Sequence, residues 1–153
     1  MRYAQHTAVS VDKSKAEIER LLMRYGADQF VSGWTDGGAK IGFHAHDKFV
    51  RFTLPLPDKT DKEFTHSPSG RRRLSPEKAS RVYEQGCRQR YRALALVVKA
   101  KLEAVETHIT TFEEEFLAHI VMPDGKTIAE HTLPMIEAAY KGGKMPKALL
   151  PGW

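Results

Sequence analysis

The chain has 153 residues, of which 41% are hydrophobic and 28% are charged. This composition is globular, and it excludes wholesale disorder, a collagen-like repeat and a small scaffold held together by disulfides. The length predicts a single domain over residues 1–153. Cys87 is the only cysteine, and no stretch approaches the ~20 apolar residues that span a bilayer. We therefore expect a cytoplasmic protein with no membrane partner.

The net charge of +5 conceals a strong segregation along the chain. Residues 71–101 carry 10 basic and 2 acidic side chains, whereas residues 102–137 carry 1 basic and 8 acidic side chains. A basic block of this size attracts phosphates or an acidic protein surface. The alternative is that the basic block folds against the acidic block, either within the molecule or in a second subunit.

The N-terminal part predicts an arm over residues 1–13 and then a helix over residues 14–25. Ser14 and Glu17 have the spacing of a capping box, and Gly26 is a typical helix end. The apolar residues recur at helical intervals, at Ile18, Leu21, Leu22 and Tyr25. The helix should therefore bury one face.

After this helix the pattern changes to that of strands. Residues 30–34 and 39–43 read as two strands around a glycine turn, and residues 49–54 as a third strand. In the third strand Val50, Phe52 and Leu54 share one face. The prediction is a three-stranded antiparallel meander.

The second half predicts a basic loop and three helical segments. Residues 55–75 form a long polar loop that ends in Ser75 and Pro76, a strong helix start. Residues 76–107 can then form one helix of about 48 Å. Capping boxes at Thr111 and Thr127 open two shorter C-terminal helices, with Pro134 beginning or kinking the last, and residues 143–153 should form an extended tail. The fold class is therefore α+β, with the long helix packed on the sheet.

Four cations fall on one line of the long helix, because spacings of 7, 11 and 18 residues are close to whole turns. They are Arg81, Arg88, Arg92 and Lys99. Apolar residues lie on both flanks of this line, which predicts a helix packed on two sides and makes it the expected site of homo-oligomerisation. The line itself has three interpretations: a phosphate or nucleic-acid contact, a solvated or ion-paired face, and a protein interface.

Arg71, Arg72 and Arg73 immediately precede the long helix, where backbone N–H groups already favour an anion. Guanidinium groups bind phosphate oxygens in a bidentate manner, and a flexible loop could deliver them to a nucleic acid or a nucleotide. The alternative is a disordered loop. Exposed aromatic residues on the sheet would assist single-strand stacking, although strand aromatics more often belong to the core. The aromatics concerned are Trp34, Phe43, Phe49 and Phe52.

Metal-binding and catalytic patterns are weak. His44 and His46 could be two ligands on one strand face near Asp47, and His119 with Glu115 is an i, i+4 pair, but neither set supplies three ligands. The alternative is ordinary surface histidines. Cys87 is expected to be a buried thiol, and the glutamates at 113–115 are expected to support a helix N-terminus. We therefore expect no metal, no cofactor and no enzymatic activity.

Several segments resemble uncharacterised small proteins encoded by bacteriophages, prophages and bacterial mobile elements. The similar segments are 88–94, 99–106, 111–116 and 122–125. The resemblance implies a setting in which small basic proteins serve replication and recombination, bind the nucleotide signals of host defence, or block a defence complex. It assigns no activity to any residue.

These observations predict a non-enzymatic phage-type accessory protein that binds a phosphate-bearing ligand, most simply nucleic acid, through the basic loop and the helix line. The predicted binding residues are Arg71, Arg72, Arg73, Arg81, Arg88, Arg92 and Lys99. The alternative is an anti-defence protein that sequesters a nucleotide signal or docks on a host protein and inhibits it. A structural or assembly component is a third class.

Overall fold

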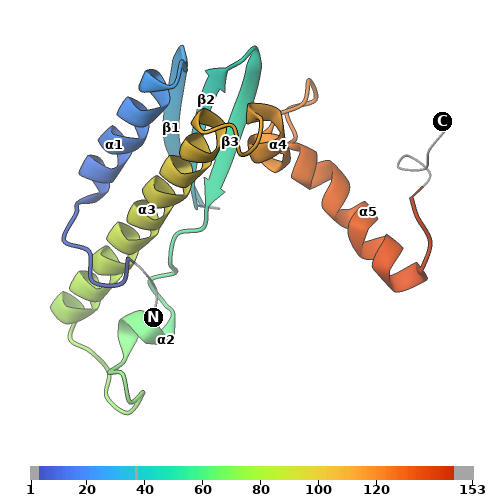
Figure 1. The fold of residues 1–153 in the computed structure, drawn as a ribbon. Coiled ribbons are helices and arrows are strands. Elements are labelled where there is room, and N and C mark those ends of the chain that lie inside the picture. Colours follow the sequence, from blue (N-terminus) through green and yellow to red (C-terminus); the bar gives the residue numbers. More distant parts are fainter. Residues whose placement is uncertain (1–3, 37, 147–153) are drawn as a thin grey trace.

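The computed structural model describes residues 4–36 and 38–146, and Figure 1 shows their arrangement. A three-stranded sheet has one face covered by two helices, α1 (Val11–Arg24) and α3 (Pro76–Glu106). The remaining helices are α2 (Lys62–Thr65), α4 (Phe112–Phe116), the 3-10 helix η1 (Leu117–His119) and α5 (Ile128–Gly142). The predicted α+β class and order of elements are confirmed.

Helix α1 begins three residues earlier than the sequence predicted. Its N-cap is Ser10, whose hydroxyl accepts a hydrogen bond from the Lys13 N–H, so the predicted arm over residues 1–13 ends before Val11. Ser14, the predicted cap, is fully buried instead. The prediction was wrong because Ser10 lies one helical turn before Ser14 and also carries a hydroxyl that can cap a helix.

The sheet is the predicted antiparallel meander, made of β1 (Gln29–Thr35), β2 (Gly38–Ala45) and β3 (Lys48–Leu54). Its register pairs Phe30 with Phe43 and Phe43 with Val50. These residues therefore share one face with the buried β2 residues Ala39, Ile41 and Ala45. Part of the predicted glycine turn, Gly37, lies outside the described residues.

One hydrophobic cluster joins the covered face of the sheet to α1, α3 and α4. Phe43, Phe112 and Phe116 meet in edge-on and tilted ring contacts, with centroids 4.8–6.4 Å apart. Helix α3 contributes the flank that the sequence predicted, from Tyr91 to Leu102. The prediction that the opposite flank is packed was wrong for three of its four residues: Val82, Ala93 and Ala100 are exposed, and Leu96 is half-buried.

The segment 55–75 is more ordered than the predicted loop. It contains α2, whose Phe64 is buried against α3, and a short antiparallel bridge between His66 and Arg73. Gly86 in α3 permits this contact, since a Cβ there would lie 2.9 Å from the Phe64 ring. The sequence did not predict that Phe64 packs against Gly86, because these two residues are 22 positions apart in the chain.

Both predicted C-terminal capping boxes form, at Thr111 with Glu114 and at Thr127 with Glu130. The first of these helices, α4, ends at Phe116, where the chain tightens into η1, and Ile120 then pairs with Val50. Helix α5 begins after the predicted cap Thr127 and runs on through Pro134 to a left-handed Gly143, so Pro134 lies inside the helix and does not begin it. In Figure 1 α5 projects away from the sheet. Of the predicted tail, residues 147–153 lie outside the described part.

Within the described residues, no helix is both long enough and apolar enough to cross a membrane.

Candidate nucleic-acid interface

The three consecutive arginines lie on an ordered turn beside the start of α3. The Ser67 N–H donates to the Arg72 carbonyl and the Leu74 N–H to the Thr65 carbonyl, each at 2.7 Å. Gly70 closes the turn with a φ of 72°, a value that favours glycine. The turn therefore fixes the backbone of Arg72 and Arg73.

The side chains of Arg71, Arg72 and Arg73 are exposed, and they form no ion pair within residues 4–36 and 38–146. The next element is the N-terminus of α3, where the Ser75 hydroxyl accepts from the Lys78 N–H and Pro76 fills the first turn. A helix N-terminus has a partial positive charge. The three guanidinium groups and the helix end are thus positive and lie within a few residues of one another along the chain.

The line of cations on α3 is only partly available to a ligand. Arg81 and Lys99 are exposed, whereas Arg88 is half-buried and its Nε donates to the Gln85 side chain at 3.0 Å. Arg92 pairs with Glu17 of α1. In this structure Arg92 therefore follows the ion-paired interpretation of the line, because α1 packs beside α3 and supplies Glu17.

The alternative, a pairing of the basic block with the acidic block, forms at one place among the described residues. Lys101 lies 3.1 Å from the Glu115 carboxylate and also donates to the Glu115 carbonyl at 3.0 Å. Glu113 pairs with Lys48, and the Glu114 carboxylate accepts the Thr111 N–H. A hydrogen bond from its own backbone, and then the one from Lys48, lower the pKa of Glu113, and the Thr111 N–H lowers the pKa of Glu114. The glutamate run is therefore structural, as predicted.

The predicted aromatic residues divide between the core and the surface. Phe43 and Phe52 are buried on the covered face of the sheet. Trp34 and Phe49 are exposed, at 79% and 52% of their surface. Only these last two remain available to stack on a base.

The histidines do not assemble a metal site. His44 forms a 2.6 Å contact with Asp28, while His46 lies beyond the end of β2 and stacks on Phe112, so the two do not share a strand face. His119 stacks on Phe52 with ring centroids 4.2 Å apart, and its predicted partner Glu115 binds Lys101 instead. Among the described residues no three metal-ligating side chains cluster.

Cys87 is half-buried rather than fully buried. A hydrogen bond from Tyr83 to Cys87 raises the pKa of Tyr83. Tyr83 in turn packs edge-on against Phe64, with ring centroids 5.9 Å apart. The thiol therefore belongs to the contact between α2 and α3.

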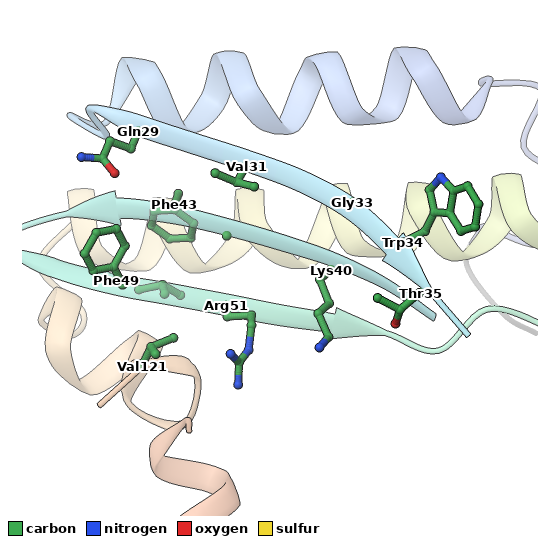
Figure 2. Close-up of a pocket in the computed structure, with 12 residues that line it drawn as sticks. Gln29, Val31, Gly33, Trp34, Thr35, Lys40, Phe43, Phe49, Arg51 and Val121 are labelled. Carbon is green, nitrogen blue, oxygen red and sulfur yellow. The ribbon is translucent and has the colours of Figure 1, made fainter. Parts of the chain in front are cut away.

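The sequence analysis missed an apolar groove on the uncovered face of the sheet (Figure 2). The groove has a volume of about 430 Å³, with Val31, Phe49 and Val121 on its walls and Lys40 and Arg51 beside them. Gly33 and Gly42 add bare backbone to its floor. The sequence did show that Val31 and Gly33 share one strand face, as do Phe49 and Arg51, because residues two apart point to the same side of a strand. It could not show which face of the sheet stays uncovered.

Arg51 connects this groove to the start of α5. Its guanidinium donates to the Gly125 carbonyl and to the Glu130 carboxylate, both at 2.9 Å. The Thr127 N–H also donates to Glu130, at 2.6 Å. These interactions lower the pKa of Glu130 and fix the point at which α5 leaves the sheet.

No protein-family model, curated protein or solved structure matches this chain.

Proposed function

We propose that this chain is a non-enzymatic accessory protein of a bacteriophage or mobile element, and that it binds nucleic acid through the phosphate backbone. The observation that supports the proposal is the exposed run Arg71–Arg73, which has no ion pair among the described residues and lies on an ordered turn beside the N-terminus of α3. Arg81 and Lys99 extend the positive surface along α3. Arg88 contributes from its half-buried position.

Phosphate recognition is the chemistry that suits this set of residues. Arginine presents a planar fork of donors that matches two phosphate oxygens, and it stays charged at every physiological pH. The hydrogen bonds of the turn reduce the conformational entropy that the backbone loses on binding. Because phosphate contacts position a protein without reading bases, we expect little sequence preference.

The test is a titration of the purified protein with single-stranded DNA, duplex DNA and RNA at several salt concentrations. Each phosphate neutralised releases counterions, so log affinity should fall against log salt with a slope of about −0.7 per contact on single strands and −0.9 on duplex. Replacement of Arg71, Arg72 and Arg73 by alanine should weaken binding and flatten this slope by two to three contacts, about equally for all sequences.

A matched control removes the same charge elsewhere. Lys13, Arg20 and Arg24 are exposed on α1, so their replacement by alanine changes the net charge equally without touching the proposed site. The control variant should retain the wild-type slope. Equal effects of the two triple variants would show that only net charge matters, and an interaction insensitive to salt would contradict phosphate binding.

The same titration separates nucleic acid from the alternative ligand, a small nucleotide signal of host defence. A nucleotide would fill a stoichiometric, saturable site, and long oligonucleotides would then show no dependence on length. Retention of wild-type binding by the Arg71–Arg73 variant would contradict both forms of the proposal.

A further inference from the structure

Helix α5 is an arm without a partner in the described part of the chain. It buries no side chain, and its main contact with the rest of the molecule is η1 at its N-terminal end. An isolated helix of this length is marginal in water, and Pro134 in its interior weakens it further. A 15-residue helix in this position therefore requires a surface to pack against.

The face of α5 that needs covering is apolar and regular. Ala129, Leu133, Ile136 and Tyr140 follow one another at intervals of four, three and four residues, which places them on one stripe. Leu133, Ile136 and Tyr140 are 60%, 42% and 88% exposed. We call these four residues the α5 stripe.

The groove on the open face of the sheet is the matching surface. Val31 is 68% exposed there and Phe49 52%. The α5 stripe is about 17 Å long at 1.5 Å per residue, and β1, which forms one side of the groove, is about 20 Å long. The two apolar surfaces are therefore similar in length.

The charges beside the two surfaces are also complementary. Lys40 projects from the open face beside Arg51, which is already paired with Glu130, and none of the strand residues on that face is acidic. Glu137 follows Ile136 at the edge of the α5 stripe, and its partner within the described residues is Lys141 in an exposed i, i+4 pair. Such a pair is weak, so Glu137 can exchange Lys141 for Lys40.

The arm does not occupy the groove of its own chain. Arg51 fixes Glu130 beside β3, and from there α5 runs away from the sheet (Figure 1). We propose that α5 of one copy packs its stripe into the open-face groove of a second copy, and that α5 of the second copy packs into the groove of the first in the same way. Each chain carries both the arm and the groove. A two-fold dimer therefore fills both grooves, and no arm or groove remains free to bind a third copy.

This surface differs from the one that the sequence indicated. The outer flank of α3 is exposed too, but the other flank of α3 is held in the core, so α3 is stable without a second copy. Helix α5 has no such support among the described residues.

The test uses two variants of the full chain that damage opposite halves of the contact. The arm variant is Leu133→Glu with Ile136→Glu, and the groove variant is Val31→Glu. The wild type should have twice the mass of the 17.3 kDa chain in light scattering, and each variant alone should have the mass of one chain. An equimolar mixture should regain the double mass, because the intact arm of the groove variant fits the intact groove of the arm variant.

Two controls keep the result interpretable. Met23→Glu on the outer side of α1 places the same charge on another exposed apolar residue and should leave the double mass unchanged. The substituted residues are all exposed, so far-ultraviolet circular dichroism should show that both variants remain folded.

A wild-type mass of one chain would overturn the proposal. So would retention of the double mass by either variant alone. Two monomeric variants that stay monomeric when mixed would also overturn the proposal, because an intact arm would then not bind an intact groove. Dissociation by Val97→Glu but not by the arm variant would place the interface on α3. None of these readouts depends on nucleic-acid binding, so the two proposals fail independently.

Discussion

His119 occupies an unusual place for a titratable side chain. It stacks on Phe52, the edge of the core, and burial lowers its pKa below the ordinary value of 6.5. The charge of nearby Lys101 acts in the same direction. The folded protein therefore favours the neutral imidazole.

This preference predicts a loss of stability in acid. Between the lowered pKa and 6.5 the unfolded chain binds more protons than the folded chain, so the free energy of unfolding falls as the pH drops through 6.5. His119→Phe keeps the ring against Phe52 and removes the titration. Urea unfolding at pH 7 and pH 5 should show a smaller pH effect for His119→Phe than for the wild type.

An unchanged pH effect in the variant would contradict the assignment. His131→Gln is a suitable control, since His131 is exposed and pairs with Asp124 at the surface. Its substitution should leave the pH effect attributed to His119 in place.

At the scale of elements, the contact between α1 and α3 includes the ion pair of Arg92 and Glu17. Both side chains are about one quarter exposed, so water screens the pair only in part. Gln85 adds a second link, because its amide donates to the Thr7 carbonyl at 2.9 Å and its oxygen accepts from Arg88. Basic residues of α3 thus hold the N-terminal region in place.

We predict that Arg92→Gln lowers the free energy of unfolding by about 1 kcal/mol. Nucleic-acid affinity should change little, because Arg92 is already paired. A double-mutant cycle with Glu17→Gln in denaturant unfolding measures the coupling between the two residues. If Arg92→Gln strongly weakened nucleic-acid binding without changing stability, Arg92 would belong to the nucleic-acid interface.

At the scale of the whole molecule, Phe116 connects the elements of the core. It is fully buried and contacts Phe43 and Phe112, so it joins the sheet to the segment that follows α3. A cavity at this position would affect α4 and the sheet together.

Phe116→Ala should therefore destabilise the protein by about 3–5 kcal/mol. This is a large share of the roughly 5–15 kcal/mol that stabilises a typical domain. The matched control is Ile109→Ala, at an exposed apolar residue, which should change stability by less than about 0.5 kcal/mol. Guanidinium unfolding followed by circular dichroism measures both, and a small effect of Phe116→Ala would mean that the cluster is not a single core.

The sequence by itself determined which elements form and in what order. Strand alternation in 49–54, the Ser75–Pro76 start of α3 and the capping boxes at Thr111 and Thr127 are local signals, because each depends on residues within a few positions of one another. The inward flank of α3 was predictable for the same reason, since helical periodicity places Tyr91, Leu94 and Val98 together. The exposed arginines at 71–73 were also visible as a charge run.

Only the tertiary structure decided how those elements use their surfaces. Arg92 was predicted to face a ligand but meets Glu17, 75 residues away, because α1 packs beside α3. Phe43 and Phe49 have similar local patterns, yet the helices cover only the face that bears Phe43. The stripe of α5, which has no partner in the described part of the chain, and the open groove likewise depend on which faces the helices cover. Which surface of an element becomes covered depends on elements far away in the sequence, and so no local pattern in the chain can show it.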